Sequence, residues 1–170
     1  MSQEIIRAST SEQIMLIENL AREIWQQHFT PIIGAQQVEY MLQKFQSTKA
    51  MLAQISNGCE YYLVSLDNEP VAYAGIIPDP EQKRLMLSKL YVKQSARGNG
   101  VGKAMLEFIE QKSMKEGLVT LWLTVNRFNL DTIAWYEHCG FVTVDEVKKD
   151  IGGGFFMDDY IMQKSLQESV

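Results

Sequence analysis

The chain is poor in the residues that bind metals and form disulfides. Its 170 residues include only two cysteines, Cys59 and Cys139, and two histidines, His28 and His138. The cysteines lie far apart and form no CxxC pair, so we expect reduced thiols, no structural zinc site and no metal cofactor. This cysteine usage is typical of a cytoplasmic protein, and we expect that location.

Long hydrophobic runs are also missing. No stretch approaches the roughly 18 uninterrupted apolar residues of a membrane span. The first residues, Met1 to Glu4, lack the basic and then apolar layout of a signal peptide. With 46% hydrophobic and 22% charged residues, the sequence is typical of a globular protein, and no membrane association is expected.

Positive charge is not in excess. Sixteen basic residues against 21 acidic ones give a net charge of −5, which argues against a nucleic-acid partner. One segment, 83–103, nevertheless carries basic residues and no acid, so its positive field favours a polyanionic cofactor unless it is an ordinary solvated face. Its basic residues are Lys83, Arg84, Lys89, Lys93, Arg97 and Lys103.

No repeat or Pro/Ser-rich linker divides the chain, so we expect a single domain over residues 1–170. Apolar periodicity predicts helices at 11–27, 38–45, 48–56, 101–116 and 129–138, the first opened by a capping box of Thr10 and Gln13. It predicts strands at 5–6, 61–66, 71–77, 85–92, 119–125, 141–144 and 156–162. The inward positions of the fourth helix are predicted to be Met105, Leu106, Phe108 and Ile109. This order predicts an α/β fold with a central mixed sheet of six to seven strands and helices on both faces.

The most informative segment is Arg97-Gly98-Asn99-Gly100-Val101-Gly102, which lies between a predicted strand and an amphipathic helix. Three glycines on alternate positions clear side chains from the loop, so several backbone N–H groups can converge on one anion. The helix adds its unpaired N-terminal N–H groups and the positive end of its dipole. The segment is therefore predicted to bind phosphate, although the hexapeptide alone also fits an ordinary strand-to-helix turn.

The spacing of the loop excludes two common phosphate-binding motifs. A dinucleotide fingerprint would need glycine at Lys103, and a Walker loop would need glycine at Arg97 and Ser or Thr at Ala104. A nucleotide kinase or NTPase is thereby excluded. The remaining pattern, R-x-x-G-x-G, resembles the acetyl-CoA pyrophosphate loop of the GNAT N-acetyltransferase superfamily.

A second segment strengthens the resemblance. After Asn126 to Asn129, the chain has Ala134, Tyr136 and Gly140-Phe141 in the order that the family often shows. Two motifs in the right order are more specific than either alone. On these two motifs, the chain is identified as a member of the superfamily over residues 61–141. Over the remaining residues the resemblance rests on the order of the elements.

The resemblance implies acetyl-CoA as cosubstrate and a set of cofactor-binding residues. Backbone groups of the strand before the loop would pair with the pantetheine amides like an added strand, and the loop would surround the pyrophosphate. Asn129 would contact the cofactor, or serve as a plain N-cap. The implied residues are Leu90, Tyr91, Val92, Arg97, Gly98, Asn99, Gly100, Val101, Gly102, Lys103 and Asn129.

The resemblance also implies a catalytic role for Tyr136. In relatives that use such a tyrosine, its phenol protonates the departing thiolate; the alternative is an aromatic core residue. Many relatives place a glutamate on the strand before the loop, but here residues 85–91 contain no carboxylate. The general base is therefore unassigned: Ser88 holding a water, Asp158 and Asp159 are candidates, and desolvation alone would lower the pKa of the amine.

The end of the first helix and the last strand pair would shape the acceptor site. Both look similar to the bacterial polyamine acetyltransferase branch, the PaiA type. The candidate substrate-binding residues are Trp25, His28, Phe29, Asp158 and Asp159. Paired aspartates suit a polycation, although they also fit a solubilised strand end.

The function that follows is transfer of the acetyl group of acetyl-CoA to a primary amine, by direct attack in a ternary complex. The acceptor would be a small molecule, with a polyamine as the leading hypothesis. Two alternatives stay open: a protein or peptide N-acetyltransferase, and a non-catalytic acyl-CoA-binding regulatory module. The missing strand carboxylate favours the second alternative. The resemblance implies a possible homodimer, because homodimers are common in the family, but no residue pattern in this sequence indicates one.

Overall fold

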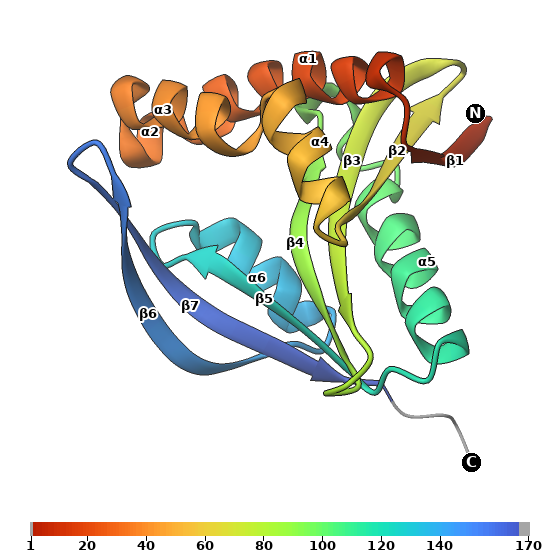
Figure 1. Cartoon of the computed structure of the whole chain (residues 1–170). Helices are drawn as coiled ribbons and strands as arrows, with labels where there is room; N and C mark the ends of the chain where they lie inside the picture. The colour runs from red at the N-terminus through yellow and green to blue at the C-terminus, as the bar shows by residue number, and fades with distance from the viewer. Residues whose placement is uncertain (1, 167–170) are drawn as a thin grey trace. The chain divides into compact units, whose positions relative to one another are not determined.

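The computed structural model describes residues 2–166, and over these residues the elements follow the predicted order (Figure 1). The helices are α1 (Ser11–His28), α2 (Thr30–Ile33), α3 (Ala35–Phe45), α4 (Thr48–Ser56), the 3-10 helix η1 (Gln94–Ala96), α5 (Val101–Lys115) and α6 (Leu130–His138). The strands are β1 (Gln3–Ala8), β2 (Glu60–Leu66), β3 (Glu69–Asp79), β4 (Arg84–Val92), β5 (Thr120–Asn126), β6 (Val142–Gly152) and β7 (Phe155–Ser165). The short helices α2 and η1 were not predicted.

The strands form one mixed sheet of seven, which confirms the predicted fold class. The strand order is β1-β2-β3-β4-β5-β7-β6. β4 and β5 pair in parallel, whereas β1 with β2, β2 with β3, β5 with β7 and β6 with β7 pair antiparallel. The parallel pair requires a crossover connection, which α5 supplies.

The chain divides into two compact units. The first holds the residues up to Ile77 together with Ser88–Ile109, and the second holds Pro78–Leu87 and the residues from Glu110 onward. β1, β2 and the first four helices belong to the first unit, whereas β5, α6, β6 and β7 belong to the second.

Local sequence signals explain the elements of the first unit. The predicted capping box is present: Thr10 Oγ1 accepts from the Gln13 N–H at 3.2 Å, and Gln13 Oε1 accepts from the Thr10 N–H at 3.1 Å. Asp67 and Asn68 turn β2 into β3 with φ angles of 49° and 69°, the left-handed values that a two-residue hairpin turn requires.

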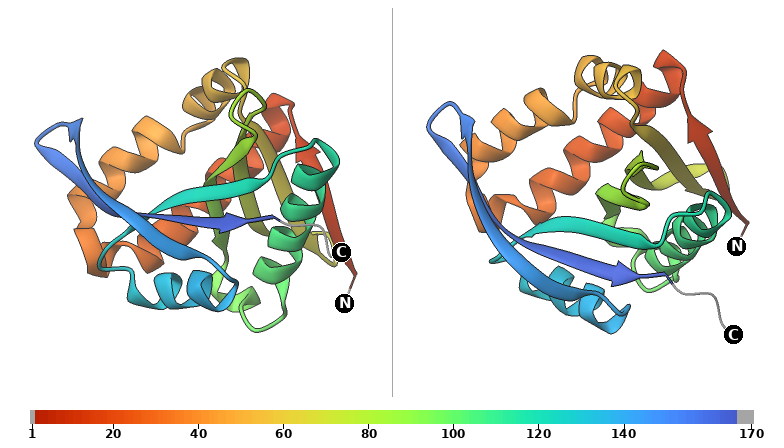
Figure 2. Two further views of the ribbon diagram at one scale, coloured as in Figure 1. Left: turned by 90° about the horizontal axis from the view of Figure 1, so that it is seen from below. Right: turned by 60° about the horizontal axis from the view of Figure 1, so that its bottom comes forward.

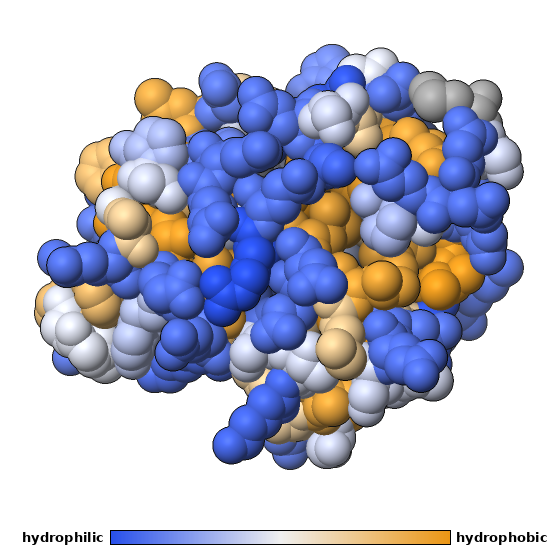
Figure 3. All heavy atoms as spheres, turned by 90° about the horizontal axis from the view of Figure 1, so that it is seen from above, coloured by the Kyte–Doolittle hydropathy of each residue, from blue (hydrophilic) through white to orange (hydrophobic). Residues whose placement is uncertain are grey.

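The helices of the first unit pack on one another. α1 contacts α2, α3 and α4, and these helices lie beside it in Figure 1 and in Figure 2. α1 buries Ile14, Ile17 and Ile24 and leaves Met15 and Leu16 exposed. The face seen from above in Figure 1 is mostly hydrophilic, with separate apolar patches (Figure 3). Scattered exposed apolar residues of this kind are normal for a protein surface.

In the second unit, the last two strands are longer than expected. The predicted strands 141–144 and 156–162 extend to Val142–Gly152 and Phe155–Ser165, and α6 lies beside this part of the sheet (Figure 2). The charged run 145–150 resembles a loop in sequence, but it forms a strand whose side chains are exposed on both faces. Gly153 and Gly154 make the turn, both with positive φ.

Two expectations about the core are wrong. Phe108, predicted to point inward, is 36% exposed and packs its ring edge-on against Tyr62. Val119, predicted to begin the alternating strand, precedes β5 and is exposed, whereas Leu121, Leu123 and Val125 are buried as expected. Within the described residues, no helix combines the length and apolar character that crossing a membrane would need.

Candidate functional site

The glycine loop adopts an open backbone conformation between η1 and α5. Gly98 and Gly100 have φ angles of +87° and +72°, and a Cβ built on either would meet no atom within 4 Å. The Asn99 side chain folds back on the loop and donates to the Ala96 carbonyl at 3.0 Å. The loop is therefore shaped by its glycines rather than by neighbouring side chains, and its backbone is accessible to a ligand.

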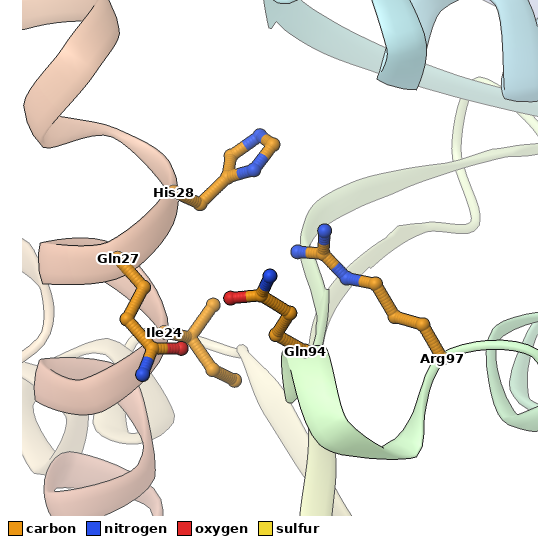
Figure 4. A pocket seen from close by; sticks show the side chains of 5 residues that line it. All are labelled: Ile24, Gln27, His28, Gln94 and Arg97. Atoms are coloured by element: carbon orange, nitrogen blue, oxygen red, sulfur yellow. The ribbon is translucent and has the colours of Figure 1, made fainter.

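A small pocket adjoins this loop. It has a volume of ≈ 110 Å³ and is lined by Ile24, Gln27 and His28 from the end of α1 and by Gln94 and Arg97. Figure 4 shows the Arg97 guanidinium, the Gln94 amide and the His28 imidazole directed toward the same space (Figure 4). Among the described residues, no carboxylate lines the pocket, so its polar character suits an anionic group.

This pocket brings together residues that the sequence assigned to different roles. Arg97 was predicted to bind cofactor and His28 to bind acceptor, whereas Gln27 and Gln94 were not singled out. The Arg97 side chain is oriented by a hydrogen bond, in which its Nε–H donates to the Val92 carbonyl at 3.4 Å. The guanidinium is thus held between the end of β4 and the glycine loop.

The end of β4 presents main-chain groups at one edge. Among the described residues, β4 pairs with β5 only from Arg84↔Thr120 to Met86↔Trp122. The Lys93 N–H donates to Val71 of β3 at 2.7 Å, so by strand alternation the main-chain groups of Leu90 and Val92 point away from β3. An extended ligand could pair with them there, as an added strand would.

Tyr91 and two predicted acceptor residues form an aromatic cluster. The Tyr91 ring lies 5.4 Å from Trp25, 6.0 Å from Phe29 and 5.4 Å from Tyr73. Trp25 Nε1 donates to the Tyr73 hydroxyl, which donates to Gln46 Oε1 at 2.9 Å. Trp25 is 3% and Phe29 7% exposed. Their positions suit support of the site more than direct contact with an acceptor.

Lys89 is buried, which the sequence reasoning missed. The residue is 6% exposed, and its ammonium donates to the Phe45 carbonyl at 2.5 Å, the Tyr61 hydroxyl at 2.5 Å and Gln54 Oε1 at 3.1 Å. Burial lowers the pKa of Lys89 to about 7. The sequence signal for this burial is the position of Lys89 on the same face of the strand as Leu85 and Leu87, which are also buried.

The positive field of segment 83–103 is therefore weaker than its number of basic residues suggests. Lys89 points inward, and Lys93 forms ion pairs with Glu69 at 3.1 Å and Glu23 at 3.5 Å. Arg84 lies 3.6 Å from Asp79. The guanidinium that lines the pocket is that of Arg97.

In the second unit, Asn129 and Tyr136 lie on α6. Asn129 occupies the N-cap position as predicted, but its buried side chain makes no capping bond to the helix. Tyr136 is 6% exposed, and its ring packs edge-on against Trp135 at 5.1 Å and Phe141 at 5.3 Å. The Tyr136 ring therefore belongs to an aromatic cluster in the second unit.

The two aspartates of β7 differ in environment. Asp158 accepts from Arg127 Nε at 2.8 Å, and Arg127 also pairs with Glu146 at 3.2 Å. Asp159 is 5% exposed, and burial, with a further contribution from Asp158, raises its pKa to about 6, although a hydrogen bond with Thr124 opposes the shift. Asp158 and Asp159 therefore do not act as two equivalent carboxylates, although the sequence analysis treated them as one acidic pair that suits a polycation. No cluster of three or more potential metal ligands occurs within residues 2–166.

The fold is that of an α/β protein, and its glycine-rich loop lies between a strand and a helix beside a pocket lined by Arg97. Residues 17–141 match the model of the Acetyltransferase (GNAT) family, and the chain belongs to this family.

Individual relatives are distant. The amino-acid acetyltransferase of Escherichia coli strain K12 is 27% identical over 144 residues, which are 85% of this chain and 28% of that protein. The chain thus spans less than a third of the length of these curated relatives.

Solved structures share the fold. The PaiA N-acetyltransferase from Thermoplasma acidophilum in complex with coenzyme A has a TM-score of 0.81 at 24% identity, covering 97% of this chain and 99% of that one. The ribosomal-protein-S18-alanine N-acetyltransferase from Escherichia coli has a TM-score of 0.73 at 19% identity, covering 99% and 97%.

Proposed function

We propose that the protein transfers the acetyl group of acetyl-CoA to a primary amine, by direct attack in a ternary complex. The observation that carries this proposal is the open glycine loop beside the Arg97 pocket, in a chain of the GNAT family. Both features favour a ligand with a diphosphate, because backbone N–H groups and a guanidinium are strong phosphate donors.

The residues of the glycine loop and of the end of β4 fit the binding of coenzyme A. Backbone N–H groups of Gly98 to Lys103 and the Arg97 side chain would hold the diphosphate. The outward main-chain groups of Leu90 and Val92 would bind the pantetheine amides. For Asn129, at the start of α6, a cofactor contact stays a prediction from the family resemblance. Coenzyme A supplies the activated thioester.

Tyr136 would act as the general acid. In the reaction, the amine nitrogen forms a bond to the acetyl carbon while the carbon–sulfur bond breaks and a thiolate leaves. A phenol held in place by aromatic packing can give its proton to that sulfur in a site from which water is excluded. The alternative of a purely structural tyrosine is tested by removing only its hydroxyl.

Asp159 is the candidate that we favour for the general base. An amine must lose its proton before it attacks, and a carboxylate with a pKa of about 6 accepts that proton better than an ordinary aspartate does. Asp158 suits this role less well, because Arg127 holds its carboxylate at 2.8 Å. Ser88, on β4, could orient a water between the amine and a base.

The acceptor amine is a finer part of the proposal. A polyamine fits the buried carboxylate of Asp159, but Arg127 neutralises the neighbouring charge of Asp158. The similarity to amino-acid acetyltransferases favours an α-amino acid as the second candidate. His28, in the pocket lining, would contact either acceptor or cofactor.

The test separates binding from turnover. Calorimetry with coenzyme A measures binding, and thiol release from acetyl-CoA measures transfer to spermidine, spermine, single amino acids and a short peptide. We expect binding and turnover with one acceptor class. Tight binding without turnover on any amine would support the regulatory module instead, and absence of binding would refute the site.

A further inference from the structure

A chain of buried hydrogen bonds links β3 to α1 and to the end of α3. The Trp25 Nε1–H of α1 donates to the Tyr73 hydroxyl of β3 at 3.3 Å, and that hydroxyl donates to Gln46 Oε1 at 2.9 Å. Gln46 follows α3 as its C-cap residue. Trp25, Tyr73 and Gln46 are 3%, 0% and 3% exposed. Since a buried polar group without a partner destabilises the fold, the Tyr73 hydroxyl is important to both of its neighbours.

The direction of this chain follows from the chemistry of its members. An indole N–H can only donate, so the Tyr73 oxygen must accept from Trp25 and use its own proton for Gln46. Burial raises the pKa of Tyr73 well above the ordinary value of a tyrosine, so the hydroxyl keeps that proton around neutral pH. Tyr73 therefore holds the Trp25 indole in one position in the folded chain.

Aromatic packing extends the chain from Trp25 to one wall of the Arg97 pocket. The Phe29 ring lies 4.3 Å from the Trp25 ring and 4.8 Å from the His28 imidazole. His28 lies in the same last turn of α1 and lines the pocket together with Gln27. Figure 4 shows the His28 side chain and the Arg97 guanidinium on opposite sides of the same space (Figure 4). The α1 wall of the pocket is therefore held in place from its buried side.

The opposite wall of the pocket has a separate support. The Arg97 side chain is oriented by the Val92 carbonyl at the end of β4, and the glycine loop is shaped by its own residues. Neither of these contacts involves Tyr73. Loss of the Tyr73 hydroxyl should therefore disturb the α1 wall, which carries His28, and leave unchanged the loop that is proposed to bind coenzyme A.

We propose that Tyr73 is a positioning residue for the acceptor amine. It holds Trp25 in the last turn of α1, and through Phe29 it sets where the Gln27 and His28 side chains lie against the acceptor. Tyr73 itself acts only through these residues. The inference rests on the proposed acetyl transfer, and it adds to that proposal the residue that orders the acceptor side of the pocket.

Tyr73→Phe tests this role, because it removes the hydroxyl and keeps the ring that packs 5.4 Å from Tyr91. We expect the KM of the amine acceptor to rise about tenfold, since a small misplacement of the groups around a substrate weakens its binding. The kcat and the Kd of coenzyme A should stay as in the wild type.

Tyr62→Phe is the matched control. The Tyr62 hydroxyl donates to Glu60 Oε1 at 2.9 Å, and its ring packs against Phe108. Tyr62 lies opposite Ala74, the neighbour of Tyr73 on β3, so the two tyrosines are on opposite faces of the sheet. This variant loses a tyrosine hydroxyl of the same unit away from α1, and it should keep the wild-type KM.

A double variant separates positioning from stability. In Tyr73→Phe, the Gln46 amide and the Trp25 indole lose a buried partner, so the urea midpoint should also fall. Adding Gln46→Met replaces the unpaired amide by an apolar side chain of similar length and should restore part of that stability. The bond to Trp25 stays absent, so the KM should remain raised. A KM that recovers together with the urea midpoint would show a merely structural role and overturn the proposal.

The remaining outcomes separate this inference from the proposed function. An unchanged acceptor KM in Tyr73→Phe, when the wild-type chain is active, would overturn the positioning role and leave the acetyl transfer standing. A wild-type chain without turnover on spermidine, spermine, single amino acids or a short peptide would overturn the proposed function itself, and the acceptor role of Tyr73 with it.

Discussion

Single buried side chains give predictions on rate and on stability, and each can be altered with little change in volume. Tyr136, Asp159 and Lys89 are all buried polar residues, but they are buried for different reasons. Tyr136 packs among aromatic rings, Asp159 lies beside Thr124, and Lys89 is surrounded by three oxygen acceptors. Their predicted effects on rate and on stability therefore differ.

For Tyr136, removal of the hydroxyl alone separates catalysis from packing. Tyr136→Phe keeps the ring contacts with Trp135 and Phe141, so the fold and cofactor affinity should be unchanged. We expect kcat to fall by about 10²-fold, because the leaving thiolate loses its proton donor. Steady-state kinetics with calorimetry of coenzyme A binding measure both. A variant with wild-type kcat would exclude Tyr136 from the reaction.

For Asp159, activity and stability should respond to pH in linked ways. Its pKa is raised to about 6, so the folded state binds a proton that the unfolded state has already lost between about pH 4 and 6. Stability should therefore decrease as pH rises through that window, while activity increases.

Asp159→Asn should lose both pH dependences. Urea midpoints and kcat/KM measured across the window provide the test, with Asp145→Asn, at an exposed aspartate of β6, as the control. If the acid limb of the rate profile survives in Asp159→Asn, this carboxylate is not the base.

For Lys89, the predicted change of stability with pH has the opposite sign. Its pKa is lowered to about 7, so between about pH 7 and 10 the unfolded state binds more protons than the folded state, and stability should rise with pH. Lys89→Met should flatten this rise, as urea midpoints of variant and wild type would show. Equal slopes for the two chains would mean that the ammonium titrates normally.

At the scale of elements, the glycine loop gives the sharpest prediction. Gly102→Val places a side chain in the first turn of α5, where the anion is expected, and should abolish coenzyme A binding in a folded protein. Gly100→Val should do the same. Gly58→Val is the control for backbone strain, because Gly58 also has a positive φ and open space but lies after α4. Retained affinity in both loop variants would refute the assignment.

Elements with a regular apolar period were predictable, and those shaped by distant contacts were not. The alternation of Leu121, Leu123 and Val125 and the capping box at Thr10 are local signals, and both are confirmed. The length of β6 was missed because residues 145–150 are charged, and an exposed edge strand has no buried face to produce alternation.

The candidate site was predictable to a similar extent. The conformation of Gly98 and Gly100 follows from residue type, because glycine adopts positive φ readily. The contribution of Gln94 to the Arg97 pocket and the burial of Lys89 depend on which elements pack together, so the local sequence does not reveal them. The roles of Tyr136, Asn129 and the acceptor residues stay predictions.

For the whole molecule, family and fold class are confirmed, whereas the single domain stays a prediction. The chain contains two compact units, but β4 contributes Arg84–Leu87 to one and Ser88–Val92 to the other. Since one strand belongs to both, we expect a single cooperative unfolding transition.

Tryptophan fluorescence can test this cooperativity. Trp25 lies in the first unit, and Trp122 and Trp135 lie in the second, so variants that retain a single tryptophan report on each unit separately. We expect coincident urea transitions for both reporters and for circular dichroism. Two separated transitions would show that the units unfold independently.

The contacts of Lys89 have a consequence for the history of the family. One ammonium binds the last carbonyl of α3, the Gln54 side chain of α4 and the Tyr61 hydroxyl of β2. A lineage that replaces this lysine by an apolar residue leaves Gln54 and Tyr61 without their shared donor. Substitutions at positions 54, 61 and 89 should therefore be inherited together, as a covarying triplet in an alignment of close homologues.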